Sequence, residues 1–473
     1  ARRPVRSMLF TEAIFLLIFL PATVVLHLGL GSMARNASLL LISLFFYIWG
    51  ETLYVAVLLT VVVVNYFAAL LIEKYEGKLR TRLLIAGVVT NVVILFYFKY
   101  MVFALTSFGF NAEDLPSPHL PLGISFFTFQ GISYLADVAS GKVKAQKRFQ
   151  DLALYICCFP QLIAGPIVRY SEIESSIGSR TITNDDISVG AWRFAIGLSK
   201  KVLIADPLSV PVDAIFGAPE GSISPAVAWL AVMAYTLQLY FDFSGYSDMA
   251  IGLGRMLGFR FPENFNYPFV AKTVNEFWMR WHMTLSRFFR DYAFDKLGGL
   301  RKGKLRGYMN IIILFTLIGL WHGAAWNFLL WGFICGVLIC AERIYIKRKL
   351  RKLPDFISHV YMFFLIIPLF LVFRSESGSQ ILEFLSSMFL LSSGEISHLH
   401  PVGRYFSPFL LMVMCAGIIF SLPVMEQIRK GLDDRVWDRH ARRIKEGAFA
   451  AMLFVSLVSV AAHSYSPFLY FRF

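Results

Sequence analysis

Charged residues are scarce in this chain, and their scarcity decides its class. They make up 16% of the 473 residues, while hydrophobic residues make up 57%; soluble domains average about 25% charged residues. Apolar runs long enough to cross a bilayer recur from Met8 onward, and no polar region is long enough to fold separately. The composition therefore excludes a soluble protein and predicts a single integral membrane domain over residues 1–473.

Familiar catalytic signatures are missing as well. The sequence contains no Walker A, GxGxxG, HExxH or GxSxG motif, which argues against an ATP-driven pump, a dinucleotide enzyme and a serine hydrolase. Its five cysteines all fall inside apolar runs without the spacing of metal ligands, and such cysteines are usually small buried side chains. We expect neither a metal site nor a bound cofactor.

Basic residues are in excess, since Lys and Arg outnumber Asp and Glu by 45 to 31 and give a net charge of +14. The excess gathers in short loops between apolar runs, as in the cytoplasmic loops of membrane proteins, so we expect no nucleic-acid partner. The acidic, proline-rich segment 109–121 and the tail 464–473 are predicted to face outward, while the orientation of the N-terminus stays open. The loops predicted to face the cytoplasm are 73–82, 141–148, 343–352 and 429–445.

The apolar segments also predict how the chain enters the membrane. Residues 1–7 (ARRPVRS) precede Met8-Leu9-Phe10, which is typical of a natural start, so we expect them to be foreign to the native chain. No cleavable signal peptide is evident, and the spans themselves must direct insertion. Twelve apolar segments predict about ten to twelve crossings. The run 311–346 is long enough for two of them, with a break at Trp321-His322-Gly323.

Polar residues gather at membrane depth between about 241 and 328. Asp242, Ser244 and Asp248 stand at the end of an apolar run, and an intramembrane carboxylate costs about 2.5–3.5 kcal/mol on insertion scales. Such a cost usually indicates a cavity, an ion pair or a functional site. Pairing of the carboxylates with Arg255 or Arg280 and a direct functional role are equally open.

The stretch 272–295 is too charged to cross lipid. Its pattern predicts an amphipathic helix that lies at the interface or enters the membrane partway. On such a helix His282 and Ser286, four residues apart, share one face. Taken alone, a histidine there is more often a packed or hydrogen-bonding residue than a catalyst.

His322 follows an almost uninterrupted apolar run, 308–321, and is flanked by Trp321, Gly323 and Trp326. It should lie within the membrane, where desolvation favours the neutral imidazole. A neutral imidazole can take a proton from a hydroxyl, which is the task of a general base in acyl transfer. A structural role, in which His322 forms a hydrogen bond with a backbone carbonyl at a helix break, is an equally open interpretation.

The sequence resembles the membrane-bound O-acyltransferase (MBOAT) family, and within it the alginate O-acetyltransferase branch. The resemblance rests on several blocks that run in order through nearly the whole chain, which chance does not produce. The blocks are QLIAGP (161–166), FDFSGYSDMAIGLGRMLGF (241–259), FPENFNYP (261–268), EFWMRWHMTLSRFFRDY (276–292), LGG (297–299), GLWHGAAW (319–326) and PFLYFRF (467–473).

This resemblance implies an all-α integral membrane fold, in which a ring of about ten to twelve transmembrane helices with re-entrant or interfacial helices surrounds a central tunnel. His322 matches the family's intramembrane catalytic histidine, and His282 matches a second polar position that is often Asn or Asp elsewhere. The catalytic core stretch is then 241–328. The residues expected to bind the donor or line the tunnel are Asp242, Ser244, Asp248, Asn264, Asn266, Glu276, Arg280, Ser286, Arg290, Trp321, Trp326 and Asn327.

The implied reaction moves an acyl group, expected to be acetyl from acetyl-CoA, onto hydroxyls of an exported polysaccharide. His322 either deprotonates the hydroxyl or carries the acyl group itself, while His282 and nearby donors orient the thioester carbonyl. Trp326, Asn327 and Ser286 are the candidate oxyanion donors. The resemblance also implies a lipid-embedded location in the bacterial cytoplasmic (inner) membrane and a separate periplasmic SGNH-hydrolase-like acetyltransferase as partner.

Two alternatives stay open. The D-alanyl transferase (DltB-like) branch of the same family shares the RWHMxxS and FRDY-like blocks but takes its acyl group from a carrier protein. The blocks at 297–299 and 319–326 favour the alginate branch. A transporter or flippase would move substrate without acyl transfer, and only the many spans and the buried polar residues support it.

Overall fold

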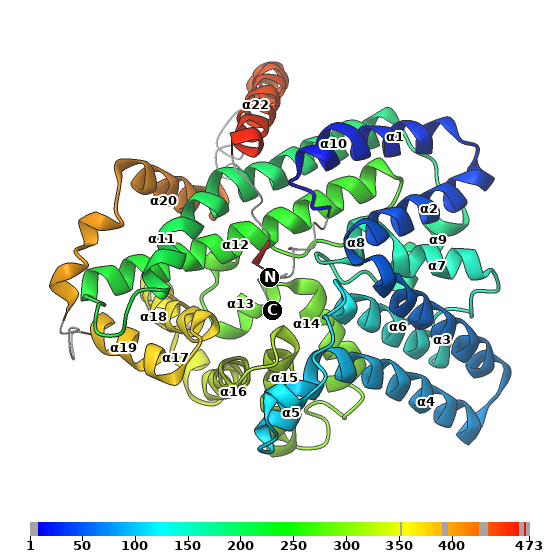
Figure 1. Ribbon diagram of the computed structural model, residues 1–473, viewed down its shortest axis with the longest axis horizontal. Helices are drawn as coiled ribbons and strands as arrows, with labels where there is room; N and C mark the ends of the chain where they lie inside the picture. The colour runs from blue at the N-terminus through cyan, green and yellow to red at the C-terminus, as the bar shows by residue number, and fades with distance from the viewer. Residues whose placement is uncertain (1–7, 351, 390–395, 425–433, 463–467, 470–473) are drawn as a thin grey trace. The chain divides into compact units, whose positions relative to one another are not determined.

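Helices account for all the regular structure in the residues that the computed structural model describes, which are 8–350, 352–389, 396–424, 434–462 and 468–469 (Figure 1). The predicted all-α membrane fold is thereby confirmed. Six helical stretches are long and apolar enough to cross a membrane, and three shorter apolar helices accompany them. The higher count of ten to twelve crossings stays a prediction. The six stretches are Ala34–Lys74, Gly77–Ser107, Pro225–Met256, Lys304–His322, Trp326–Ile346 and Asp355–Arg374.

The chain divides into two compact units, and the described residues of the first are 8–196, 246–263 and 468–469. The prediction of one domain is not tested by this division. The helices of the first unit are α1 (Leu20–Gly29), α2 (Ser32–Glu51), α3 (Val55–Lys74), α4 (Gly77–Leu95), α5 (Met101–Ser107), α6 (Ile124–Ala139), α7 (Phe149–Cys157), α8 (Phe159–Leu162), α9 (Tyr170–Gly178) and most of α10 (Asn184–Ser199).

The second unit carries both candidate histidines, His282 and His322. Residues 225–245 of the long helix α12 (Pro225–Met256) belong to this unit, and residues 246–256 belong to the first unit. The other helices of the second unit are η5 (Lys200–Ala205), α11 (Asp206–Phe216), α13 (Val274–Arg280), α14 (Met283–Phe289), η7 (Arg290–Phe294), α15 (Lys304–His322), α16 (Trp326–Ala341), η8 (Glu342–Ile346), α17 (Lys347–Leu350), α18 (Asp355–Arg374), α19 (Gly378–Met388), α20 (Pro408–Phe420) and α22 (Asp434–Ala462).

In the first unit, the ends of two predicted cytoplasmic loops meet. The Glu73 carboxylate accepts a hydrogen bond from the Ala145 backbone N–H at 2.9 Å and pairs with Lys147. The Arg80 guanidinium donates to the Val138 carbonyl at 2.8 Å. Loops 73–82 and 141–148 therefore lie on the same side of the unit, as their shared basic character predicted.

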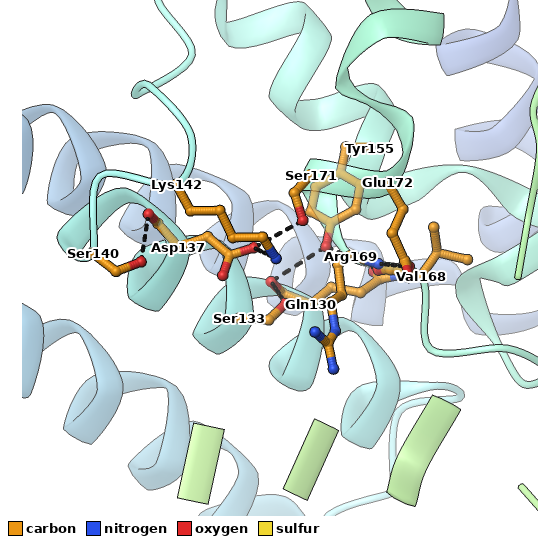
Figure 2. A network of polar contacts seen from close by, with 10 residues as sticks. All are labelled: Gln130, Ser133, Asp137, Ser140, Lys142, Tyr155, Val168, Arg169, Ser171 and Glu172. Atoms are coloured by element: carbon orange, nitrogen blue, oxygen red, sulfur yellow. Dashed lines mark hydrogen bonds and ion pairs between the residues drawn. The ribbon is translucent and has the colours of Figure 1, made fainter. Parts of the chain in front are cut away.

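Polar contacts also tie the second of these loops to α9 (Figure 2). The Asp137 carboxylate at the end of α6 lies 3.4 Å from the Lys142 ammonium and accepts from the Ser171 hydroxyl at 3.1 Å. Nearby, the Tyr155 hydroxyl donates to the Val168 carbonyl at 3.0 Å. These contacts join α6 to α9 beside the loop and α7 to the segment that precedes α9.

The predicted break in the run 311–346 is confirmed. Helix α15 ends at His322 and α16 begins at Trp326, and the two helices lie side by side as a hairpin (Figure 1). Their backbones approach so closely that a Cβ on Gly319 would lie 2.1 Å from the Phe328 carbonyl oxygen. Small residues allow such contact between helices in lipid. The hairpin thus holds His322 at its turn.

Some sequence predictions lie outside the described residues. Residues 1–7, most of the outward tail at 464–473 and the first part of the basic loop 429–445 belong to this group. From Asp434 onward that loop is helical, because α22 begins there and runs to Ala462. The short apolar helix Glu446–Ala462 is therefore preceded, within α22, by basic residues that the sequence analysis assigned to a loop.

Candidate active site

Asp242 lies in the middle of α12, fully enclosed, and its charge is matched by a lysine. The Lys201 ammonium of η5 lies 2.7 Å from the Asp242 carboxylate and 2.7 Å from that of Asp206. The predicted partners Arg255 and Arg280 were wrong. The reason is the close approach of α12 to this segment at Gly245, where a Cβ would meet the Gly197 carbonyl oxygen at 2.8 Å. That approach brings η5 beside Asp242.

Asp248 belongs to the first unit and pairs with Arg193, whose Nε lies 2.7 Å from its carboxylate. Arg255 instead faces Asp186 at 3.3 Å, and Arg280 pairs with Glu276 one helical turn away at 2.9 Å. The expectation that the carboxylates are paired was right, but the partners were wrong. Asp248 is not brought together with the histidines within the second unit.

The stretch 272–295 is not the continuous helix that its pattern predicted. It forms α13 and α14, which are separated at Trp281 and His282. His282 adopts the left-handed conformation with φ 45° and ψ 54°, which costs a non-glycine residue about 1–2 kcal/mol. Because His282 precedes α14, it does not share a helix face with Ser286, and that prediction was wrong. Strained residues of this kind often occur at functional sites.

The His282 imidazole is held by Asn264, another of the predicted site residues. The Asn264 Oδ1 atom accepts from the Thr284 backbone N–H at 3.3 Å and lies 3.0 Å from His282 Nδ1. Since a backbone N–H can only donate, the atom at this position is the amide oxygen, and His282 Nδ1 must donate to it. Burial lowers the pKa of His282 to about 3. The neutral ring therefore carries its lone pair on Nε2.

His322 is the last residue of α15 and is buried among aromatic rings. Its ring centroid lies 4.9 Å from that of Trp321, 5.3 Å from that of Trp331 and 5.2 Å from that of Phe373. The Trp321 ring is also 6.0 Å from His282. The structure thus places both predicted histidines beside the same indole, within one unit.

The remaining predicted residues mostly support the loop that carries His282. The Asn266 backbone N–H donates to the Arg280 carbonyl at 3.0 Å, and the Arg280 guanidinium returns a bond to the Asn266 carbonyl at 3.1 Å and one to Glu276. Arg290 pairs with its neighbour Asp291. Ser244 is buried on α12, and its hydroxyl has no hydrogen-bond partner among the described residues.

Two of the three candidate oxyanion donors bond to backbone carbonyls. The Ser286 hydroxyl donates to the Trp278 carbonyl at 2.9 Å, and the Asn327 amide donates to the Ser375 carbonyl at 2.9 Å. Trp326 is 67% exposed at the start of α16. The printed bonds of Ser286 and Asn327 go to the backbone, and the role of the three residues as oxyanion donors stays a prediction.

Glu342 is a site residue that the sequence analysis missed. It is completely buried, and its carboxylate accepts from the backbone N–H groups of Val274 at 2.6 Å and Asn275 at 3.4 Å. The adjacent Arg343 guanidinium donates to the Asn275 side chain at 2.7 Å. The end of the His322 hairpin thereby holds the start of α13. A lone carboxylate at the end of an apolar helix was the available signal.

Metal chemistry has no candidate ligands in the part of the chain that the structure describes. No group of three or more His, Cys, Asp or Glu side chains there could hold a metal ion. What the second unit offers is two imidazoles among aromatic rings, and the neutral one, His282, has a defined lone pair. Such a pair can move a proton and position a hydroxyl.

Comparison with known proteins identifies the family. The model of the membrane-bound O-acyltransferase family matches residues 41–354. A probable alginate O-acetylase AlgI of Pseudomonas putida is 36% identical over 492 residues, covering 98% of this chain and all of the relative. A peptidoglycan O-acetyltransferase of Helicobacter pylori is 34% identical over 517 residues, covering 98% of each chain.

A more distant relative comes from the other branch weighed above. A teichoic acid D-alanyltransferase of Bacillus subtilis is 31% identical over 260 residues, covering 51% of this chain and 65% of the relative. The bacterial relatives and the apolar helices indicate a multi-pass protein of the inner membrane. The chain therefore belongs to the membrane-bound O-acyltransferase family and is an O-acyltransferase.

Proposed function

We propose that this protein takes an acetyl group from acetyl-CoA at the cytoplasmic face and passes it toward hydroxyls of an exported polysaccharide, with His322 and His282 as the catalytic pair. The observation that carries the proposal is the placement of both imidazoles beside Trp321. The names of the two near-full-length relatives, an alginate O-acetylase and a peptidoglycan O-acetyltransferase, support acetyl as the group and a glycan as the acceptor.

His322 serves as the general base. It takes the proton of the acceptor hydroxyl as the hydroxyl oxygen bonds to the thioester carbonyl carbon. The tetrahedral intermediate then collapses, the C–S bond breaks, and the proton on the imidazolium passes to the departing thiolate. General acid–base catalysis of this kind contributes about 10²–10⁴-fold to the rate. In a second route His322 attacks the carbonyl itself and carries the acetyl group until the hydroxyl arrives.

His282 has a different task from the one that its family position suggests. With Nδ1–H donated to Asn264, its neutral ring offers a lone pair at Nε2. A lone pair cannot donate to the thioester carbonyl. His282 therefore accepts a hydrogen bond from a hydroxyl or amide N–H of a substrate and positions that group near His322, which lowers the barrier through orientation.

The direction of transfer follows from charge. The basic loops 73–82 and 141–148 attract an anionic donor such as acetyl-CoA to the cytoplasmic face. A periplasmic SGNH-hydrolase-like acetyltransferase completes delivery to the polymer, and the outward segment 109–121 is its proposed contact. A transporter without acyl transfer is set aside, because the chain belongs to an acyltransferase family.

The proposal is tested in a strain whose polysaccharide acetylation relies on this protein. His322→Ala is expected to abolish polymer-bound acetyl ester, measured by release in mild alkali, while the protein stays in the membrane at wild-type abundance. The matched control is His398→Ala, the same change at an exposed histidine, which should leave ester content unchanged. Wild-type ester content in His322→Ala would overturn the catalytic assignment.

The choice of acyl donor distinguishes acetyl transfer from D-alanyl transfer. The 31% identity to the teichoic acid D-alanyltransferase is the observation that keeps it in view. Membranes that contain the full chain are supplied either with acetyl-CoA or with a D-alanyl thioester on a carrier protein. We expect free thiol to be released only in the sample supplied with acetyl-CoA. Release only in the sample supplied with the aminoacylated carrier would establish D-alanyl transfer.

A further inference from the structure

Two indole N–H groups near His322 are buried without an acceptor. Trp331 is 2% exposed and Trp278 is 8% exposed, and neither Nε1 atom has a hydrogen-bond partner among the described residues. Buried polar groups in proteins are nearly always hydrogen-bonded. An unpaired buried donor can therefore indicate a position where a bound ligand supplies the acceptor. Trp331 and Trp278 were not among the predicted site residues.

These two indoles are neighbours, and one of them touches the candidate base. The Trp331 ring centroid lies 5.4 Å from that of Trp278 at an interplanar angle of 88°, and 5.3 Å from that of His322 at 89°. They come from different helices, α16 and α13. Trp331 therefore adjoins His322 and Trp278 adjoins Trp331, so the two unpaired N–H groups belong to one aromatic cluster with the candidate base.

The helices that carry them are held firmly. The α16 backbone is pressed against α15 at Gly332, where a Cβ would lie 2.2 Å from the Phe315 carbonyl oxygen. Helix α13 is held at its start by Glu342, and the Trp278 carbonyl accepts from Ser286. Donors on rigid elements are preorganised, which is the property that electrostatic catalysis requires.

Three other donors of the site already bond to protein groups. His282 Nδ1 donates to Asn264, and the hydroxyl of Ser286 and the amide of Asn327 donate to backbone carbonyls. An acyl thioester brings one atom that needs donors during the reaction, its carbonyl oxygen. That oxygen gains negative charge as the hydroxyl attacks.

We propose that the Nε1–H groups of Trp331 and Trp278 form the oxyanion hole of this enzyme. As the C–O bond to the acceptor forms, the π electrons of the thioester carbonyl move onto its oxygen, and the two indoles donate hydrogen bonds to that oxygen without giving up their protons. When the C–S bond breaks, the electrons return and the carbonyl is restored. The inference rests on the proposed function, because it names the donors for that same acyl transfer.

The test removes one donor at a time while keeping an aromatic ring. Trp331→Phe and Trp278→Phe are compared with the wild type as full chains in membranes, with acetyl-CoA as the probe and release of free thiol as the readout. Loss of one oxyanion-hole donor lowers kcat by about 10²–10³-fold. KM for acetyl-CoA should change little, because these bonds strengthen only as charge develops.

The matched control is Trp49→Phe, which removes the same indole N–H at a side chain that is 45% exposed in the first unit. It should keep the wild-type kcat. Thermal midpoints in detergent establish that each variant is folded, and Trp278→Phe tests the proposal independently if Trp331→Phe does not fold.

The possible results are distinguishable. A lower kcat with unchanged KM in the folded phenylalanine variants supports the proposal. Wild-type kcat in both, or a raised KM with unchanged kcat, overturns it. If His322→Ala is inactive while both phenylalanine variants are fully active, only the oxyanion hole fails; if His322→Ala stays active, the proposed function fails first.

Discussion

The Asn264 side chain accepts a hydrogen bond from His282 Nδ1 at 3.0 Å, and this bond fixes which nitrogen of the histidine carries the proton. The assignment is secure because the same oxygen also accepts from the Thr284 backbone N–H. Without Asn264, the left-handed His282 would be free to adopt either tautomer. The bond thus joins the sequence block 261–268, which contains Asn264, to the block 276–292, which contains His282.

Asn264→Asp tests this tautomer through the pH dependence of activity. Burial holds the pKa of His282 at about 3, so the wild-type ring stays neutral throughout the physiological range. A carboxylate on the Nδ1–H raises a neighbouring cation's pKa by about 1–3 units. The variant should therefore lose activity on the acid side at a pH about 1–3 units higher than the wild type.

The measurement is the rate of thiol release from acetyl-CoA between pH 4 and pH 8. Asn184→Asp, the same substitution at an exposed position, should keep the wild-type profile. An Asn264→Asp profile that coincides with the wild type over the whole range would show that this hydrogen bond does not govern His282.

Glu342 is predicted to hold the start of α13. Glu342→Ala leaves two backbone N–H groups, those of Val274 and Asn275, without their acceptor, and such a loss costs about 1–3 kcal/mol. Glu342→Gln keeps an acceptor oxygen and should lie between the alanine variant and the wild type. The thermal midpoint of unfolding in detergent measures both.

Glu376→Ala is the matched control for this prediction, since the Glu376 side chain is 86% exposed. Surface substitutions of this kind usually change stability by less than about 0.5 kcal/mol. If Glu342→Ala had the same thermal midpoint as Glu376→Ala and the wild type, the interpretation that Glu342 holds the start of α13 would be wrong.

Lys201 is predicted to be essential for the fold of the second unit. Lys201→Met leaves the Asp242 carboxylate buried without its cation, and removal of one partner from a buried pair costs about 3–5 kcal/mol. The double variant Lys201→Met with Asp242→Asn removes both buried charges and should recover most of that loss, because the other partner of Lys201, Asp206, is 22% exposed and can be solvated. Folded yield from detergent extraction and the thermal midpoint report both effects.

The exposed pair of Lys272 and Asp355 supplies the comparison, because its side chains are 44% and 72% exposed. Exposed pairs contribute about 0–1 kcal/mol to stability. Lys272→Met should therefore have the folded yield and the thermal midpoint of the wild type. Equal losses in Lys201→Met and the double variant would contradict the idea that an unpaired charge causes the damage.

The fold class and the break at His322 could be read from the sequence for clear physical reasons. Scarcity of charge and repeated apolar runs leave a membrane protein of helices as the stable solution. His322 and Gly323 interrupt one long apolar run, and the hairpin of α15 and α16 turns there.

The break at His282 could not be read in the same way. No Pro or Gly stands between Val274 and Phe289, and the amphipathic pattern continues across the break. Tertiary bonds from Asn264 and Glu342, which are distant in sequence, override the local preference for one helix. The same holds for Asp242, whose partner Lys201 is 41 residues away.

Trp331 is another residue whose role could not be predicted from the sequence. A tryptophan within an apolar helix is usually a core or interfacial residue, and nothing in its neighbourhood in the sequence separates a packed indole from one that donates to a substrate. Only the contact with His322 and the unpaired Nε1 group point to a function.

The central claim is that His322 carries out the proton transfer of acyl transfer. The most direct measurement is the rate of thiol release from acetyl-CoA by the purified full chain in the presence of a polysaccharide acceptor. Loss of a general base lowers such a rate by about 10²–10⁴-fold, so His322→Ala should fall by that factor while its thermal midpoint stays near that of the wild type. An unchanged rate in folded His322→Ala would contradict the account.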